Sequence, residues 1–294
     1  MSQLPPSQIS PHRGLRVELP GRYGPIAALR ARTPEIHGHP APIALLVPGY
    51  TGSKEDFAPL LDPITDAGMH AVAIDLPGQY ESDGPAEESA YLPAALGAVL
   101  AELAGKLSAE GNRVVLLGHS FGGLVARAAV LAGAPVVGLT LLDSGPSELP
   151  DGQRRRALDA GDPMLRRHGI AAAQRLQEEL ARNAPAKDPA LAAFLRERFL
   201  RTRPEALLGM GQALRTEPDQ VSTLARQLHT QGIPCLVTCG EYDDAWSVPA
   251  QRDMADRLDA DFAVIPDAGH SPNTENPPML LATLLPTWRS WLNA

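Results

Sequence analysis

The sequence predicts an α/β protein: a mostly parallel, doubly wound sheet of about eight strands with an inserted all-helical cap. Three observations support this fold class. Short apolar runs alternate with helix-like segments along most of the chain, which is typical of a parallel sheet covered by helices on both faces. The alternation stops between residues 147 and 216, where no strand-like run occurs. Near the middle of the chain, a serine with glycines two residues to either side stands where an apolar run meets a helix-like segment.

The expected core comprises residues 15–146 and 217–294, after a loose, proline-rich tail at 1–14. Two opening strands are joined by a turn at Pro20 and Gly21. The later strands are near-continuous apolar runs, as expected of parallel strands that are buried on both faces. The expected strands span residues 15–19, 26–31, 43–47, 70–74, 114–117, 137–142, 234–239 and 262–265. The expected core helices span residues 54–66, 91–107, 121–131, 221–229, 251–258 and 278–292.

Residues 147–216, between the sixth and seventh strands, are predicted to form the separate helical cap. Three helical patterns lie within them, at 170–182, 189–201 and 204–214. Asp188 followed by Pro189 is a typical helix start. Residues 151–215 hold 13 Lys and Arg against 8 Asp and Glu, whereas the whole chain carries a net charge of -8. We interpret the arginines of this segment, at 154–156 and 166–167, as a solvated helical face, with an anion site as the alternative.

Composition narrows the class of protein. A chain of 294 residues that is 44% hydrophobic can bury one large core, and no apolar run approaches the ~20 residues of a membrane span. The N-terminus shows no secretory signal, and the negative charge argues against a nucleic-acid partner. Cys235 and Cys239 lie four residues apart in one expected strand, about 13 Å from each other, too far for a disulfide. We therefore expect two free thiols and a cytoplasmic protein.

The stretch Gly118-His-Ser-Phe-Gly122 carries the clearest chemical signal. A G-x-S-x-G sequence between a buried strand and a helix is typical of a nucleophile elbow. Such a turn forces strained backbone angles on the serine, here Ser120, and a Cβ at either glycine would collide with neighbouring backbone. The start of the helix offers free N–H groups and the positive end of a dipole where negative charge develops. We expect Ser120 to be the nucleophile.

Two further loops carry candidate side chains just past expected strands, at the edge where open α/β sheets bind ligands. They follow the strands at 234–239 and 262–265. Through five motifs in the same order, the chain resembles the α/β-hydrolase fold superfamily, in its capped, cofactor-free serine-hydrolase branch. The resemblance covers about residues 40–145 and 219–294, and its motifs lie at 48–52, 75–78, 118–122, 240–243 and 269–277.

The resemblance implies a catalytic triad in the chain order Ser, Asp, His. A serine hydroxyl is inert at neutral pH and needs a general base, which His270 would supply from the loop after the last strand. Asp243, three residues after Gly240 as the family pattern has it, would hold the imidazole in the correct tautomer. Asp244 is the alternative acid, and an exposed helix N-cap is the other interpretation of that residue.

The resemblance also implies an oxyanion hole of two backbone N–H groups. One belongs to Phe121, after the nucleophile, and the other, by position, to Tyr50 in the loop after the third strand. That loop begins Pro48-Gly49 where the family usually has His-Gly, a departure that affects loop geometry more than activity. Tyr80 stands where relatives usually carry a second glycine, and we expect its bulk to narrow one wall of the site.

Other residues have simpler explanations. Trp246 joins Tyr80 as a candidate pocket-lining residue, with core packing as an equal alternative. His119 is predicted to be structural and to point away from the nucleophile. His37 and His39 could bind a metal, but their loop offers no third ligand, so no metal and no cofactor are expected.

The expected function is hydrolysis of an ester or similar acyl bond in a small-molecule substrate through an acyl-enzyme intermediate. C–C bond hydrolysis, thioester hydrolysis and cofactor-free perhydrolysis use the same triad and remain alternatives. A non-catalytic ligand-binding protein with this fold is the alternative from another class. The sequence determines neither the substrate nor the oligomeric state.

Overall fold

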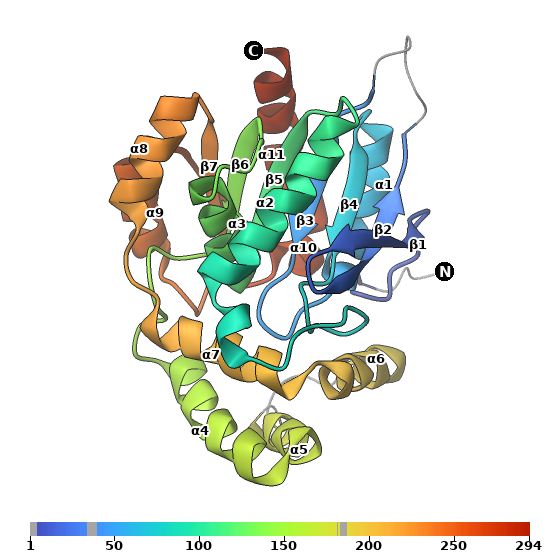
Figure 1. Cartoon of the computed structure of the whole chain (residues 1–294), viewed down its shortest axis with the longest axis vertical. Coiled ribbons are helices and arrows are strands. Elements are labelled where there is room, and N and C mark those ends of the chain that lie inside the picture. Colours follow the sequence, from blue (N-terminus) through green and yellow to red (C-terminus); the bar gives the residue numbers. More distant parts are fainter. Residues whose placement is uncertain (1–4, 34–39, 181, 183–186) are drawn as a thin grey trace.

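A computed structural model of the chain describes residues 5–33, 40–180, 182 and 187–294. Its centre is an eight-stranded sheet in the order β1-β2-β4-β3-β5-β6-β7-β8 (Figure 1). Strand β2 runs antiparallel to β1 and β4, and all the other neighbouring strands are parallel. The predicted fold class, a mostly parallel α/β sheet of about eight strands, is confirmed.

The strands lie where the apolar runs predict them. They are β1 (Leu15–Gly21), β2 (Gly24–Ala31), β3 (Ile43–Val47), β4 (His70–Ile74), β5 (Val114–His119), β6 (Gly138–Leu142), β7 (Cys235–Gly240) and β8 (Asp261–Ile265). Strands β3 to β7 are buried at every residue, because helices cover both of their faces. Cys235 and Cys239 are free and buried, as expected, and burial raises the pKa of both thiols to about 12.

The predicted turn at Pro20 and Gly21 is wrong. Both residues belong to β1 and pair with Pro25 and Gly24 of β2. The turn falls two residues later, between the paired glycines. Gly24 has a φ of +121°, a conformation that only glycine adopts without strain, so this glycine and not the Pro-Gly pair marks the chain reversal.

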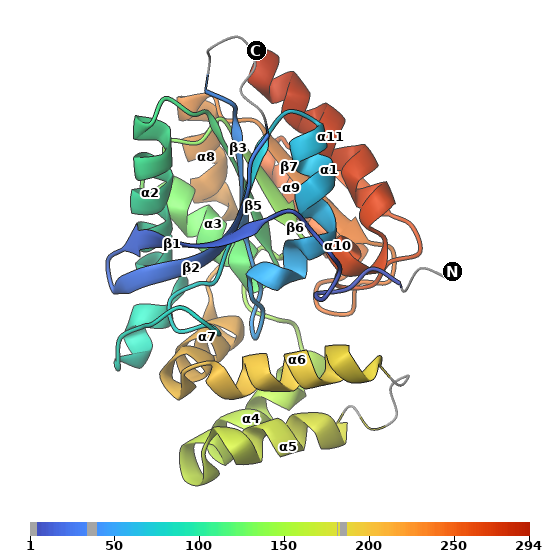
Figure 2. The same cartoon turned by 90° about the vertical axis from the view of Figure 1, so that its right-hand side faces the viewer.

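Helices form a layer on each face of the sheet. They are α1 (Ala58–Asp66), α2 (Pro93–Ala109), α3 (Phe121–Leu131), α8 (Val221–Gln231), α9 (Val248–Leu258), α10 (Pro272–Glu275) and α11 (Pro277–Asn293), with short 3₁₀ helices η1 (Lys54–Phe57) and η2 (Glu88–Tyr91). Figure 2 shows α2, α3 and α8 on one face and α1 and α11 on the other. Accordingly, the buried apolar side chains fall into two main clusters, one on each side of the sheet.

Of the five helices that the structure describes between β6 and β7, the first four form a separate layer at one end of the sheet (Figures 1 and 2). We call them the inserted helices: α4 (Gln153–His168), α5 (Ile170–Leu180), α6 (Pro189–Arg201) and α7 (Pro204–Thr216). Asp188 caps α6 as predicted, since its side chain accepts hydrogen bonds from the N–H groups of Ala190 and Leu191.

The sequence pattern missed α4, so the expectation of three inserted helices is wrong. Only Leu158 and Leu165 of α4 are buried, and Pro163 lies inside the helix. Two buried leucines among exposed charged residues give no clear helical periodicity, which is the signal that sequence analysis depends on. The helix is instead held by its contacts with α5 and α7.

The N-terminal segment makes hydrogen bonds to the core from Gln8 onward. The sequence predicts a loose tail at 1–14, but the backbone N–H of Arg13 donates to Asp62, and Gln8 Nε2 lies 3.1 Å from Asp56 Oδ1. His37 and His39 lie outside the described residues.

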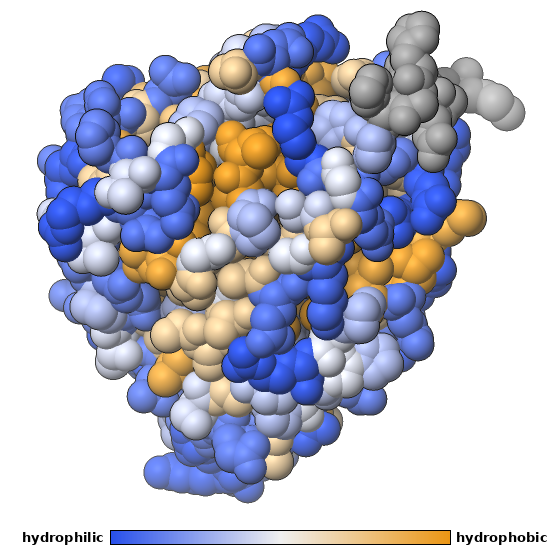
Figure 3. All heavy atoms as spheres, turned by 45° about the horizontal axis from the view of Figure 1, so that its top comes forward, coloured by the Kyte–Doolittle hydropathy of each residue, from blue (hydrophilic) through white to orange (hydrophobic). Residues whose placement is uncertain are grey.

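The surface agrees with a chain that buries its apolar residues. Within the described part of the chain, no helix is both long and apolar enough to cross a membrane. Figure 3 shows the end of the molecule opposite the inserted helices, where hydrophobic residues lie in patches between more extensive hydrophilic ones.

Candidate active site

Ser120 occupies the tight turn between β5 and α3. Its φ of 55° and ψ of −121° are strained angles for a side chain with a Cβ. A Cβ on Gly118 would overlap the carbonyl of Gly122, and a Cβ on Gly122 would overlap the carbonyls of Val47 and Pro48. Both glycines are therefore required by the close approach of the backbone, as the sequence motif predicts.

Ser120, His270 and Asp243 form one hydrogen-bonded chain. His270 Nε2 lies 2.9 Å from Ser120 Oγ, and His270 Nδ1 lies 2.7 Å from Asp243 Oδ1. The carboxylate holds the imidazole proton on Nδ1, so the lone pair of Nε2 accepts the serine hydroxyl. All three side chains are almost completely buried. The structure thus brings together three residues that are far apart in the sequence, from the ends of β5, β7 and β8.

Asp243, and not Asp244, faces the histidine. Its carboxylate also accepts hydrogen bonds from the N–H of Ala245 at 2.9 Å and from Gln251 Nε2 at 2.7 Å. Burial raises the pKa of Asp243, but the hydrogen bonds and the charge interaction with His270 outweigh it and hold the pKa below its usual value. Asp244 is exposed and forms an ion pair with Arg154 of α4 instead of capping the local backbone.

Asp143, just after β6, is a residue of the site that the sequence analysis missed. It is fully buried, and its Oδ1 accepts the N–H of Gly240 at 2.9 Å. Burial and the negative charge of Asp243 raise the pKa of Asp143 well above its usual value. Both effects favour the neutral form of Asp143 beside the carboxylate of Asp243. The signal that could have identified Asp143 is its position directly after β6, the strand that pairs with β7.

Asp143, Asp243 and His270 also make up the one group of three potential metal-ligand atoms within 4.8 Å of one another in the described part of the chain. The contact of 2.7 Å between His270 Nδ1 and Asp243 Oδ1 is a hydrogen bond. Ligands at about 2 Å on either side of an ion would need to stand farther apart. We assign no metal to this group.

The loop after β3 lies against the serine. A Cβ on Gly49 would stand 3.0 Å from Ser120 Cβ. The carbonyl of Gly49 accepts a hydrogen bond from Gln79 Nε2 at 2.8 Å, and Gln79 Oε1 accepts the N–H of Leu76 at 3.0 Å. In a trans peptide the C=O and N–H point in opposite directions, so Gln79 also fixes the direction of the Tyr50 N–H. Sequence reasoning missed Gln79, although it immediately follows the 75–78 motif.

Phe121 is the first residue of α3. Its N–H belongs to the first turn, whose N–H groups have no acceptor within the helix. The N–H groups of Phe121 and Tyr50 therefore stay our predicted oxyanion donors.

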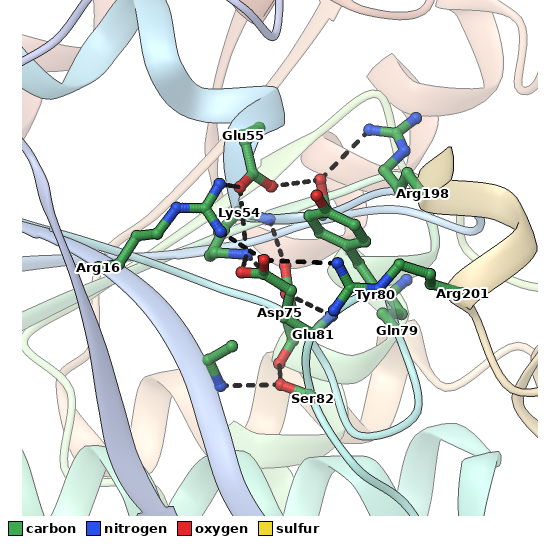
Figure 4. Close-up of polar contacts among 12 residues, drawn as sticks. Arg16, Lys54, Glu55, Asp75, Gln79, Tyr80, Glu81, Ser82, Arg198 and Arg201 are labelled. Carbon is green, nitrogen blue, oxygen red and sulfur yellow. Dashed lines mark hydrogen bonds and ion pairs between the residues drawn. The ribbon is translucent and has the colours of Figure 1, made fainter. Parts of the chain in front are cut away.

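A buried cluster of charged side chains holds the loop after β3 in place (Figure 4). Lys54 is fully buried, and its Nζ lies 2.9 Å from Asp75, 2.7 Å from Glu81 and 3.1 Å from Glu55. The backbone N–H of Lys54 also donates to Asp75 at 2.7 Å. These contacts join the loop after β3 to the loop after β4.

Tyr80 belongs to this cluster and not to the substrate cavity. Lys54 Nζ and the Arg201 guanidinium each lie 4.7 Å from the centre of its ring, and Phe194 packs edge-on against it. The expectation that Tyr80 lines the pocket is therefore wrong. Its φ of 38° explains why relatives carry glycine here, since a left-handed conformation strains any residue with a Cβ.

Trp246 and His119, the two aromatic side chains beside His270, have structural roles. Trp246 is buried in the core, its Nε1 donates to the carbonyl of Glu148, and it is absent from the cavity lining. Of its two predicted roles, core packing is the one that the structure shows. His119 Nε2 donates to the carbonyl of His270 at 2.7 Å. Burial, with a smaller contribution from His270, lowers the pKa of His119 to about 4. His119 is a neutral structural support, as expected.

A cavity of about 350 Å³ opens beside Ser120 and His270. Its floor belongs to the core, and the inserted helices supply most of its apolar lining. Its volume lies at the small end of the range for small-molecule pockets.

Comparison with known proteins identifies the family of the chain. The model of the Alpha/beta hydrolase family matches residues 44–283. A Bacillus subtilis (strain 168) protein named putative 2-succinyl-6-hydroxy-2,4-cyclohexadiene-1-carboxylate synthase is 26% identical over 243 residues, which are 78% of this chain and 84% of that protein.

Solved structures are similar over nearly the whole length. A thermophilic esterase from Thermogutta terrifontis has a TM-score of 0.68 and 25% identity, covering 95% of this chain and 98% of that one. MenH from S. aureus has a TM-score of 0.70 and 20% identity, covering 90% of this chain and 99% of that one. The second likeness shows the fold alone.

Proposed function

The chain belongs to the alpha/beta hydrolase family, and from that premise we propose that it is a serine hydrolase that cleaves an ester or similar acyl bond through an acyl-enzyme. One observation carries the proposal. The hydrogen-bonded chain from Asp243 through His270 to Ser120 has contacts of 2.7 and 2.9 Å, within the range that proton transfer requires.

In this mechanism Ser120 Oγ attacks the substrate carbonyl carbon while His270 Nε2 takes the hydroxyl proton. Asp243 stabilises the imidazolium that forms. The imidazolium then gives its proton to the leaving group, and the acyl-enzyme remains. Water, deprotonated by the same nitrogen, attacks the acyl carbon. The bond from this carbon to Ser120 Oγ then breaks, the imidazolium returns the proton to Oγ, and the acid is released. The raised pKa of Asp143 favours its neutral form, so that Asp243 supplies the negative charge beside the imidazolium.

The negative charge that develops on the carbonyl oxygen needs preorganised donors. We assign them to the backbone N–H groups of Phe121 and Tyr50. Gln79 is a positioning residue for the second donor, because its hydrogen bond to the Gly49 carbonyl fixes the peptide that carries the Tyr50 N–H.

We assign the role of a cap to the inserted helices, with the core comprising residues 15–146 and 217–294. The cavity beside Ser120 has walls from α4, α5, α6 and α7, which supports this division. A cap of this kind excludes water from the site and sets the shape of the substrate. Limited proteolysis that cuts within residues 147–216 before any core segment is the expected result, and early cleavage within the core would contradict the assignment.

Ester hydrolysis is preferred over the chemistries that share the triad. The Thermogutta terrifontis protein, similar over 95% of this chain, is an esterase. The Bacillus subtilis relative is named a synthase, so a reaction other than ester hydrolysis at the same triad is the second candidate. Purely non-catalytic ligand binding would not require the strained Ser120 backbone or its aligned base.

The test is labelling by a fluorophosphonate probe together with hydrolysis of p-nitrophenyl acetate. Labelling should occur at Ser120 alone, and Ser120→Ala should lose roughly 10⁴- to 10⁶-fold in kcat. The matched control is Ser290→Ala, in an exposed position of α11, which should keep wild-type activity. Absence of labelling, or a Ser120→Ala variant with most of its activity, would overturn the proposal.

A further inference from the structure

Building on the proposed function, we propose a substrate class for this site: an uncharged ester that carries an unbranched hydrocarbon chain of medium length. The chain would lie under the inserted helices while its carbonyl group lies against Ser120. The lining of the cavity, its charges and one glycine each support this assignment.

The cavity has one polar and one apolar half. Ser120, His270 and the loop after β3 form the polar floor. Aliphatic and aromatic side chains from all four inserted helices make up most of the remaining lining, and the charged side chains that these helices contribute are Arg154, Asp162, Arg198 and Arg215. The apolar side chains include Leu158 and Leu165 of α4, Leu176 of α5, Phe199 of α6, and Leu207 and Leu214 of α7. An ester with a hydrocarbon chain matches this division, because its one polar group is the group that must reach the serine.

The basic residues of the lining are already paired. Arg198 lies 2.6 Å from Asp56, Arg215 lies 2.7 Å from Asp162, and Arg154 lies 2.6 Å from Asp244. The pair of Arg198 and Asp56 is buried, with about a tenth of either side chain exposed. A substrate carboxylate would have to displace a partner carboxylate or remain unpaired in a buried site, and both are costly. The lining therefore selects a neutral ligand.

Gly211 on α7 leaves space for the chain. A Cβ at this position would stand 3.5 Å from the Tyr50 hydroxyl and 3.7 Å from Leu158 Cδ2, both parts of the cavity wall. A larger side chain at 211 would therefore enter the cavity. Gly209, two residues earlier, differs because its Cβ would overlap the carbonyl of Glu88. Gly211 thus determines how much chain the cavity accepts.

The first experiment measures kcat/KM for two ester series. One series lengthens the acyl chain of p-nitrophenyl esters from acetate to dodecanoate, and the other lengthens the alcohol of alkyl acetates. Each methylene that leaves water for the apolar half should raise kcat/KM about fourfold, or about 0.8 kcal/mol, until the cavity is full. We expect a maximum at medium length in one of the series, which also tells which side of the ester lies under the cap.

A matched pair of substrates tests charge. The p-nitrophenyl ester of hexanoic acid and the mono-p-nitrophenyl ester of adipic acid have equal chains, and only the second ends in a carboxylate. The neutral ester should be preferred by roughly a hundredfold or more.

Substitution of Gly211 tests whether the hydrocarbon chain of the substrate lies beside α7. Gly211→Leu should shift the maximum to shorter chains and lower kcat/KM for the best wild-type ester at least tenfold more than for acetate. Gly211→Ala should give a small shift in the same direction, since a Cβ there meets only ordinary contacts. Gly105→Leu is the control, because a Cβ at this α2 glycine has no atom within 4 Å and lies away from the cavity. It should leave the profile unchanged.

The outcomes separate this inference from the proposed function. Flat profiles in both series, preference for the adipate ester, or a Gly211→Leu profile equal to wild type would each overturn the substrate assignment. In all three cases Ser120-dependent hydrolysis of acetate would still support the serine hydrolase. Loss of fluorophosphonate labelling would instead remove the basis of both.

Discussion

Two regions of the molecule are built in different ways. One is the edge of the core that carries Ser120, and the other is the set of inserted helices that covers this edge. Ser120 and Asp243 follow fully buried strands, and His270 follows β8, which is buried only at its last residue. The Asp243 carboxylate is held by the Ala245 N–H and by Gln251 Nε2, and the His270 carbonyl by His119. Among the inserted helices, α4, α5 and α6 bury only two residues each, whereas α7, which packs on the core, buries eight of its 13. Exposed or half-exposed ion pairs such as Arg154 with Asp244 and Arg166 with Glu88 link them to the core.

Because of this difference, we expect the core edge to determine the chemistry and the inserted helices to determine which substrate is accepted. Strands β5, β7 and β8 lie near one another in one rigid sheet, so the loops that follow them meet with little freedom. The inserted helices contribute side chains that can change without disturbing the sheet, and they supply most of the cavity wall. We therefore expect substitutions at the core edge to affect activity and stability strongly, and substitutions on the helix surface to have small effects.

The largest contrast is predicted between two adjacent aspartates. Asp243→Asn should cost on the order of 10⁴-fold in kcat, because the amide leaves His270 in the wrong tautomer. Asp244→Asn, which removes only an exposed ion pair with an inserted helix, should cost less than about tenfold. Steady-state kinetics on one ester measures both. The reverse order would place the catalytic acid at Asp244.

His119 should make the stability of the core depend on pH. Its pKa is about 4 in the folded protein and about 6.5 when unfolded. Between these values the unfolded chain binds more protons, so stability is full above pH 6.5 and declines as the pH falls toward 4. The decline due to His119 should be on the order of 3 kcal/mol.

Urea unfolding across this pH range tests the His119 prediction. His119→Gln should reduce the loss of unfolding free energy between pH 7 and pH 4. His229→Gln, in an exposed position of α8, should not. Equal pH dependence in wild type and His119→Gln would show that His119 is not neutral in the folded state.

Gln79 should affect catalysis without contacting the substrate. Gln79→Ala removes one of the two hydrogen bonds that the Gly49 carbonyl accepts and leaves the one from the Gly52 N–H. The peptide that carries the Tyr50 N–H is then held less firmly, so kcat should fall about tenfold to a hundredfold, less than for loss of an oxyanion donor itself. KM should change little, and affinity for a boronic acid inhibitor should fall in parallel with kcat. The exposed Gln231 provides the control variant Gln231→Ala. A rise in KM alone would contradict a role in positioning the donor.

The smallest effect is predicted for the ion pair between Arg154 and Asp244, which links the inserted helices to the core. Arg154→Ala removes an ion pair whose side chains are 40% and 58% exposed, so the free energy of unfolding should fall by less than about 1 kcal/mol. Thermal or urea unfolding at low salt measures this. A loss of several kcal/mol would mean that the inserted helices depend on this pair, against the contrast between the two regions.

Most of the fold could be predicted from local sequence. Apolar runs such as those of β3 and β4 are typical of buried strands, and such runs mark all eight strands to within a few residues. The Gly-x-Ser-x-Gly turn and the histidine loop also carry local signals, which is why the sequence alone identifies Ser120 and His270 as candidates. Helix α4, with two buried residues, had no comparable signal.

The sequence by itself determined the strands, the nucleophile elbow and the order of the candidate triad, because each depends on neighbouring residues. Only the tertiary structure decided which side chains meet across the sheet. Asp143 reaches Asp243 because β6 pairs with β7, and Gln79 reaches Gly49 because β4 pairs with β3. Tyr80 and Trp246 face away from the cavity for the same reason. Contacts between distant segments depend on strand pairing and packing, and no local pattern of residues encodes them.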